Sequence, residues 1–223
     1  MGKLSRAELG QRLRLYVLTD SRAAAGRPLV DLVAAALEGG ATAIQLREKE
    51  LGGRQQVELG RALRRLTRAA GALLIVNDRV DIAYAVEADG VHLGQDDLPP
   101  SVARAILGPD AIIGGSAGNL DELARSVAEG VDYLGVGPVY ATTTKPDAGE
   151  PIGPAGLAQL RARTDLPIVG IGAVTADNVG EVIAAGADGA AVIGAVIGAE
   201  DVRAAARRLR QAIEEALRAR PAM

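Results

Sequence analysis

Two polar clusters of this chain contain a lysine, although the chain otherwise uses arginine for its basic positions. Only three of the 25 basic residues are lysines. Lys49 ends the cluster QLREK at residues 45–49, and Lys145 follows three threonines at 142–144. A lysine ammonium is a compact point charge, whereas guanidinium is a planar fork. We therefore predict that both lysines contact an anion, with chance placement of so few lysines as the alternative.

Acidic residues that could hold a metal follow two other apolar segments. Asp78 comes after one segment, and Asp97, with Asp96 beside it, comes after the next. Because the chain has no cysteine and a single histidine, His92, any metal must be held mainly by oxygen. Mg²⁺ bound by one or two carboxylates, water and substrate phosphates fits these ligands. In the alternative interpretation, Asp78 is only a helix cap.

Cations placed beside such a metal site indicate a pyrophosphate or polyphosphate ligand. Arg47, Lys49 and Lys145 come from two different loops, and a pyrophosphate needs several charged partners. The loop that holds Lys145 runs to Pro154, and loops of this length in a compact domain are usually functional or mobile. The alternative for Arg47 and Lys49 is an exposed helix start with Glu48 as their ion partner.

Glycines near the end of the chain could leave backbone N–H groups open to a phosphate. They occur in the segment GIGA at residues 170–173 and at Gly194 after Ile193. Phosphate binding by backbone amides at such positions is common in barrels. Close packing is the alternative reason for these glycines.

The elements that must position these residues alternate regularly along the chain. Eight short apolar runs read as strands, at residues 13–18, 43–46, 73–76, 90–93, 112–114, 133–136, 168–171 and 189–193. Eight stretches with helical periodicity separate or follow them, at 29–38, 54–69, 81–86, 101–107, 120–129, 156–163, 178–185 and 202–218. This alternation predicts parallel strands in a single (β/α)₈ TIM barrel. A doubly wound open sheet is the runner-up.

The predicted barrel takes up residues 1–223 as one domain, with residues 1–12 as a polar extension or short helix. Chemistry in such barrels lies at the C-terminal ends of the strands, and nearly all the polar and glycine clusters above follow a predicted strand.

Composition excludes several classes of function. The net charge of −3 gives no general electrostatic reason to bind nucleic acid. Without cysteine there is no disulfide, thiol catalysis or thiolate metal site. No apolar run approaches the roughly 18 residues of a membrane span, and residues 1–14 lack the apolar core of a signal peptide. We expect a cytoplasmic protein, and the apolar helix faces are compatible with a homo-oligomer.

Several of these motifs, taken together and in order, resemble the thiamine-phosphate synthases, a family of (β/α)₈ barrels. The resemblance covers most of the chain, from Tyr16 to Ile193. It depends on YVLTD at 16–20, QLREK at 45–49, NDRVD at 77–81, ADGVHLGQDD at 88–97, GPVY at 137–140 with Thr142, Thr144 and Lys145, and IVGIG at 168–172.

The resemblance implies a transferase that joins 4-amino-2-methyl-5-hydroxymethylpyrimidine pyrophosphate to a thiazole phosphate, releases pyrophosphate and uses Mg²⁺. It implies that the pyrimidine pyrophosphate contacts Gln45, Arg47, Lys49, Asn77, Ser116 and Lys145, and that Arg47, Lys49, Ser116 and Lys145 are catalytic. Asp78 and Asp97 would bind Mg²⁺. The thiazole phosphate would contact Thr142, Thr144, Ala173, Ile193 and Gly194.

The family's dissociative route needs no protein nucleophile, because the departing pyrophosphate leaves a pyrimidine cation that the thiazole nitrogen traps. The protein must stabilise charge on the leaving group. We therefore interpret His92 as a structural residue, pointing into or beside the barrel.

Three positions depart from the family pattern. Gly118 stands where many members have histidine, and the related thiazole tautomerases rely on that histidine, which favours a synthase. Ala173 and Gly194 stand where glycine and serine are common, so a serine contact with the thiazole phosphate would be lost. The rival hypotheses are a thiazole tautomerase, a phosphosugar isomerase or epimerase that uses Asp78 and Asp97 as acid and base, and a binding protein without turnover.

Overall fold

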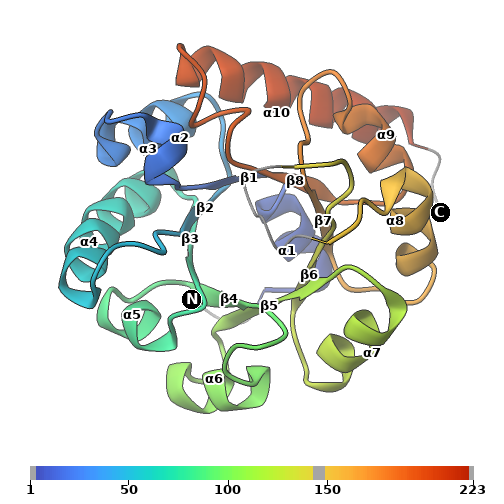
Figure 1. Ribbon diagram of the computed structural model, residues 1–223, viewed down its shortest axis with the longest axis horizontal. Helices are drawn as coiled ribbons and strands as arrows, with labels where there is room; N and C mark the ends of the chain where they lie inside the picture. Colours follow the sequence, from blue (N-terminus) through green and yellow to red (C-terminus); the bar gives the residue numbers. More distant parts are fainter. Residues whose placement is uncertain (1–3, 143–148, 221–223) are drawn as a thin grey trace.

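Eight parallel strands form a closed barrel in the computed structural model, which describes residues 4–142 and 149–220 (Figure 1). Each strand pairs with the next along the chain, and β8 pairs with β1. The strands are β1 (Leu15–Leu18), β2 (Ala43–Leu46), β3 (Leu73–Asn77), β4 (Gly90–Leu93), β5 (Ile112–Ala117), β6 (Tyr133–Val136), β7 (Ile168–Ile171) and β8 (Gly189–Val192). The predicted (β/α)₈ barrel is confirmed, and the open sheet is excluded.

Apart from α1, the helices surround the barrel in sequence order (Figure 1). Within the described residues they are α1 (Arg6–Arg12), α2 (Ser21–Ala24), α3 (Leu29–Glu38), α4 (Gly53–Ala70), α5 (Val80–Ala85), α6 (Pro100–Leu107), α7 (Leu120–Ala128), α8 (Gly153–Arg161), α9 (Val179–Ala184) and α10 (Val202–Ala219). The predicted helices 29–38 and 202–218 agree with α3 and α10 to within a residue. The short helix α2 was not predicted; it begins because the Asp20 side chain accepts a hydrogen bond from the amide of Ala23.

Two strand boundaries differ from the prediction in a way that affects the site. β3 includes Asn77, and β5 continues through Ala117, so Asn77 and Ser116 lie within strands rather than after them. Ser116 stays in register because it pairs with Gly135 of β6, and its neighbour Ala117 pairs with Val136. Side chains on these strands therefore have directions set by the barrel wall.

The strands are apolar on both faces because helices cover one face and the barrel interior covers the other. Leu15, Val17 and Ile44 belong to the large core between strands and helices. Tyr16, Leu73 and Tyr133 belong to a second core inside the barrel. This double burial explains the continuous apolar runs of the strands.

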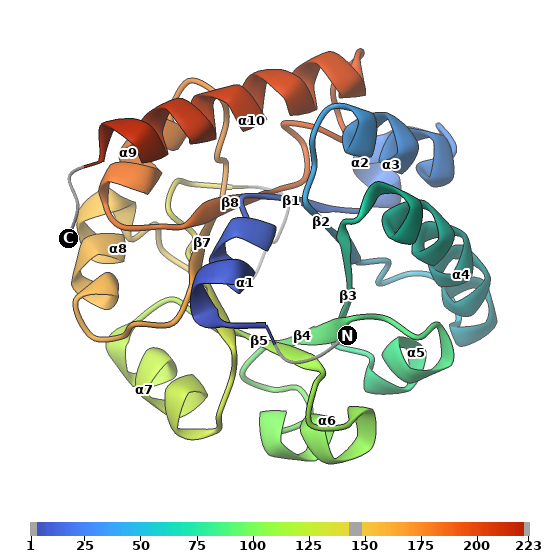
Figure 2. The ribbon, with the colours of Figure 1, turned by 180° about the vertical axis from the view of Figure 1, so that it is seen from behind.

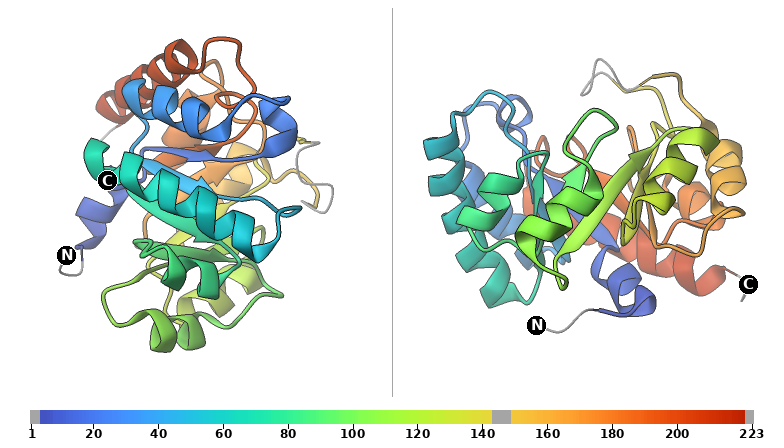
Figure 3. Two further views of the ribbon diagram at one scale, coloured as in Figure 1. Left: turned by 90° about the vertical axis from the view of Figure 1, so that its left-hand side faces the viewer. Right: turned by 90° about the horizontal axis from the view of Figure 1, so that it is seen from below.

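Helix α1 closes the N-terminal end of the barrel. Figure 2, which views the molecule from behind, shows it lying across the centre of the barrel, and the right-hand view of Figure 3 shows it below the strands. Its Leu9 is only 3% exposed and packs in the interior core with Leu13. Ser5 begins the helix through a capping box with Glu8. The predicted short helix within residues 1–12 is therefore present, and the opposite end of the barrel is left for a site.

A repeated hydrogen bond ties the strands together at this closed end. Before each even-numbered strand, a side-chain oxygen accepts the backbone N–H of the preceding odd-numbered strand; the acceptors are Thr42, Asp89, Asp132 and Asp188. Each of the three aspartates also pairs with an arginine of an outer helix: Arg64, Arg104 and Arg161, respectively. The residue before each even-numbered strand thus plays the same part in four successive pairs of strands.

Candidate active site

A cavity of about 570 Å³ opens at the C-terminal ends of the strands. It is lined by every predicted site residue that the structure describes: Gln45, Arg47, Lys49, Asn77, Asp78, Asp97, Ser116, Thr142, Ala173, Ile193 and Gly194. Thr144 and Lys145 lie outside the described residues, so the predicted meeting of Lys49 and Lys145 stays a prediction. Residues from seven strands and their following loops thus converge on one cavity.

Two carboxyl groups, those of Asp78 and Asp97, lie side by side in this cavity. They share a hydrogen bond, and burial together with the nearby Asp97 raises the pKa of Asp78 to about 6. Lys49 and Arg47 oppose this rise, so both cations lie close enough to act on the carboxyl pair. Two neighbouring carboxyl groups that disfavour each other's ionised form supply the oxygen ligands that a hard cation prefers.

The backbone fixes the position of both acids. Asp78 adopts the left-handed region with φ of 61°, and its N–H donates to the carbonyl of His92 at 2.9 Å. Asp97 accepts the N–H of Gly94 at 2.7 Å. Asp78 is therefore not a helix cap, because Arg79 takes the cap position of α5 and no side chain caps that helix.

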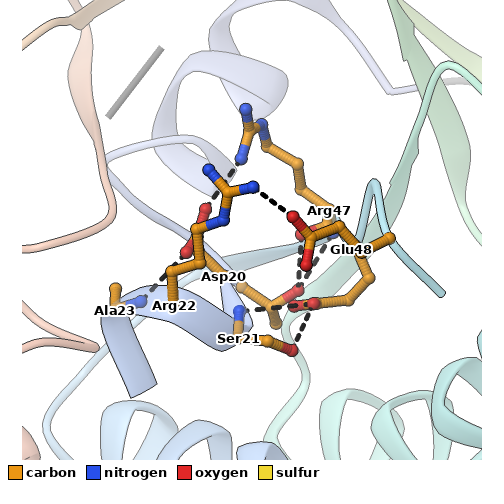
Figure 4. Close-up of polar contacts among 8 residues, drawn as sticks. Asp20, Ser21, Arg22, Ala23, Arg47 and Glu48 are labelled. Carbon is orange, nitrogen blue, oxygen red and sulfur yellow. Dashed lines mark hydrogen bonds and ion pairs between the residues drawn. The ribbon is translucent and has the colours of Figure 1, made fainter. Parts of the chain in front are cut away.

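Arg47 is held by Asp20, an acid that is not among the predicted site residues. Its guanidinium donates to Asp20 at 3.0 Å, and the two side chains are only 11% and 13% exposed (Figure 4). Glu48 turns instead to the hydroxyl and N–H of Ser21. The alternative of an exposed helix start with Glu48 as ion partner is therefore wrong for Arg47.

Five side chains form a continuous hydrogen-bonded chain across the floor of the cavity. Gln45 donates from Nε2 to the hydroxyl of Tyr16 at 2.7 Å, and Tyr16 bonds to the hydroxyl of Tyr133 at 3.0 Å. Tyr133 bonds to Nδ1 of His92, and Nε2 of His92 bonds to Oγ of Ser116, each at 3.0 Å. Burial raises the pKa of both tyrosines above the ordinary value, so their hydroxyls stay protonated. His92 does point into the barrel, but it also contacts a predicted substrate residue.

Different physical reasons account for glycine after β7 and after β8. A Cβ at Gly172 would lie 2.7 Å from Cα of Pro138, and the residue has a φ of 106°. Close packing therefore explains Gly172. Gly194 lines the cavity, yet a Cβ there would meet no atom within 4 Å. The space beside Gly194 is open to a ligand.

A closed barrel with cations and paired acids at the C-terminal ends of its strands defines a class, the (β/α)₈ enzymes that act on phosphorylated substrates. The family model described as thiamine monophosphate synthase matches residues 15–196. The chain belongs to this family, whose members are transferases that form thiamine phosphate.

Relatives and solved structures agree with this assignment. The thiamine-phosphate synthase of Moorella thermoacetica is 61% identical over 202 residues, which cover 91% of this chain and 96% of that protein. The thiamine-phosphate synthase of Chloroflexus aurantiacus is 54% identical, covering 88% of this chain and 91% of that protein. The structure of thiamine phosphate pyrophosphorylase from Pyrococcus furiosus superposes with a TM-score of 0.87 at 48% identity, over 94% of this chain and 99% of that one. The predicted synthase activity is confirmed.

A solved 3-hexulose-6-phosphate synthase has a TM-score of 0.63 but only 20% identity, so it shows the shared barrel alone. The rival phosphosugar isomerase thus has only the fold in its favour.

Proposed function

We propose that the cavity binds both substrates of thiamine phosphate formation at once. The pyrimidine pyrophosphate contacts Gln45, Arg47, Lys49, Asn77, Ser116 and Lys145, and the thiazole phosphate contacts Thr142, Thr144, Ala173, Ile193 and Gly194. The observation that carries the proposal is the Asp78–Asp97 pair with Lys49 and Arg47 beside it. Acids that hold a cation, next to basic side chains, match a metal-bound pyrophosphate.

We propose that Asp78 and Asp97 hold Mg²⁺. The donor set fits this ion, because two oxygen ligands leave its other positions to water and substrate phosphate. Within residues 4–142 and 149–220, there is no cluster of three or more acidic, histidine or cysteine side chains that would bind a metal without the substrate. When bound, Mg²⁺ neutralises charge that builds on the pyrophosphate as it leaves.

The chain's own residues then have three tasks in the reaction. Arg47 and Lys49 stabilise the negative charge of the departing pyrophosphate, with Lys145 proposed as a third cation. Asp20 holds the Arg47 guanidinium in place before the substrate arrives, which limits the reorganisation needed during the reaction. Gln45 and Ser116 orient the pyrimidine ring, so that its methylene carbon faces the thiazole nitrogen. The C–O bond to pyrophosphate breaks before the C–N bond forms, and no side chain of the protein attacks the substrate.

The test is a coupling assay with both substrates, Mg²⁺ and the purified protein. We expect thiamine phosphate and pyrophosphate in equal amounts, no product in excess chelator, and recovery when Mg²⁺ is restored. Asp97→Asn should lower the rate by about 10²-fold or more. Asp110→Asn is the matched control, because Asp110 is exposed and does not line the cavity, and it should keep full activity. Full turnover in chelator, or an active Asp97→Asn variant, would contradict the metal assignment.

Three broader predictions accompany this proposal. We propose that residues 1–223 act as one domain. No helix of the described residues is long and apolar enough to cross a bilayer. A cytoplasmic location and a homo-oligomer remain predictions from the sequence.

A further inference from the structure

The hydrogen-bonded chain below the cavity has a direction, and that direction is set at Gln45. The amide nitrogen of Gln45 can only donate, so the Tyr16 oxygen accepts and the single Tyr16 proton goes to Tyr133. Tyr133 then donates to Nδ1 of His92, which leaves the imidazole proton on Nε2. Nε2–H donates to Oγ of Ser116, and the Ser116 proton is left to point into the cavity.

We call this chain of five residues the polarity relay; its members are Gln45, Tyr16, Tyr133, His92 and Ser116. We infer that the polarity relay selects an aminopyrimidine, because it presents an acceptor at one end and a hydroxyl donor at the other. At the Gln45 end, the amide donates to Tyr16 and so offers Oε1 as an acceptor. An aminopyrimidine presents the complementary pair, an amino donor next to a ring-nitrogen acceptor. A 4-oxo analogue presents the reverse pair. The inference rests on the proposed function, because it assumes that Gln45 and Ser116 face the pyrimidine.

The barrel interior leaves room for the relay at two glycines. A Cβ at Gly114 would overlap the ring of Tyr133, and a Cβ at Gly135 would lie 3.0 Å from Cε1 of His92. Gly114 of β5 pairs with Tyr133 of the neighbouring β6, whereas Gly135 of β6 reaches His92 of β4 across the interior, past the intervening β5. Tyr133 and His92 also lie with ring centroids 5.5 Å apart. The two rings are therefore fixed by packing, and Tyr133 and His92 act as positioning residues that do not need to touch the substrate themselves.

In the polarity relay, the buried tyrosine hydroxyls determine whether Gln45 and Ser116 act as donor or acceptor toward the substrate. Removing the Tyr133 hydroxyl frees the imidazole to change tautomer, after which Ser116 can either donate or accept. Removing the Tyr16 hydroxyl frees the Gln45 amide to turn. Each change leaves the shape of the cavity wall intact, because phenylalanine retains the ring. Each substitution should therefore lower the preference for the aminopyrimidine over its 4-oxo analogue, with a smaller effect on the free energy of unfolding.

The experiment measures binding of two pyrophosphates that differ only at position 4, the 4-amino substrate and its 4-oxo analogue, with Mg²⁺ and without thiazole phosphate. For the unmodified protein we expect titration calorimetry to show about 10²-fold tighter binding of the amino compound. Tyr133→Phe and Tyr16→Phe should each lower the ratio of the two binding affinities, amino over oxo, by about tenfold. Tyr84→Phe is the matched control, because Tyr84 is 68% exposed, and it should leave the ratio unchanged.

The possible outcomes distinguish a failure of the polarity relay from a failure of the proposed substrate site. If both relay variants bind the two compounds more weakly by the same factor, the tyrosines are only structural and the inference is overturned. A preference of the unmodified protein for the oxo compound would show the opposite polarity and would also overturn it. The amino compound could bind and be converted to thiamine phosphate while both variants keep the affinity ratio of the unmodified protein. In that case the proposed function stands and the polarity relay is overturned. If the amino compound does not bind at all, the proposed site assignment fails first.

Discussion

Replacing Asp78 by asparagine should stabilise the metal-free protein while it abolishes metal binding. The Asp78 carboxyl is partly buried beside Asp97, and these surroundings raise its pKa from 3.8 to about 6. The folded protein therefore prefers the protonated acid, and keeping it ionised above pH 6 costs stability. Asparagine removes that charge, and it tolerates the left-handed backbone at this position, where φ is 61°.

The size of the effect follows from the pKa. A rise from 3.8 to about 6 corresponds to about 3 kcal/mol for a fully buried acid. Because Asp78 is only partly buried, solvent screening reduces the expected gain to about 1–2 kcal/mol. The penalty is absent below about pH 3, grows mainly between the two pKa values of 3.8 and about 6, and is complete above them. The stabilisation of Asp78→Asn should therefore be fully present at pH 8 and about one third as large at pH 4.5.

Urea unfolding in chelator at these two pH values measures the difference directly. Asp81→Asn is a control for which we expect the opposite sign. Arg79 lowers the pKa of Asp81, so removing the Asp81 charge should lower the free energy of unfolding at pH 8. Adding Mg²⁺ at pH 8 should stabilise the unmodified protein but not Asp78→Asn. If Asp78→Asn gained nothing at pH 8, or gained equally at both pH values, the carboxyl pair would not be under the repulsion described above.

Five further substitutions, two of them compared as a pair, test other parts of the molecule. Asp20→Asn should lower kcat/KM by about tenfold because Arg47 loses its anchor, whereas Arg47→Ala should lower it by about 10²-fold to 10³-fold; equal losses would mean that Asp20 acts on the substrate itself. Lys145→Ala should lower the coupling rate by about 10²-fold to 10³-fold, and an unchanged rate would remove this lysine from the site. Asp132→Ala should destabilise the barrel by about 2–4 kcal/mol in urea, because a strand amide and an arginine lose their acceptor, yet leave kcat unchanged in the folded fraction. Gly194→Ser should leave the melting temperature unchanged and tighten thiazole phosphate binding by about 3-fold to 10-fold, since the new side chain meets open space; a large drop in melting temperature would contradict that geometry.

The fold was predictable because its signal is periodic and local. Each strand is buried on both faces, so it appears in the sequence as a short apolar run, and each run is followed by a helical stretch. The ends of the runs were less certain. Ser116 is polar, and Gly114 and Gly115 precede it, so nothing local shows that β5 continues through Ala117.

The first layer of the site was predictable for the same reason, since polar residues after strands must meet at one end of a barrel. Contacts between distant residues were not. Tyr16 and Tyr133 are 117 positions apart, and Asp20 is 27 positions from Arg47. Asp20 follows the first strand, so its place in the sequence already puts it at the same end of the barrel as Arg47. For the tyrosines the available signal was indirect, namely glycine at 114 and 135, where a strand interior would otherwise carry a side chain.

Partly buried acids have opposite electrostatic surroundings at the two ends of the barrel, and this difference separates stability from function. At the closed end, Asp89, Asp132 and Asp188 each accept a strand amide and pair with an arginine, so their charge is neutralised within the fold. At the open end, Asp78 faces Asp97, and its charge is only partly offset by the cations nearby. Neutralising an acid at the closed end should therefore destabilise the barrel without altering its chemistry, whereas neutralising Asp78 should stabilise the barrel and abolish turnover. The stability lost at the open end is the free energy that a bound cation can restore, so the carboxyl pair couples occupation of the site to the stability of the fold.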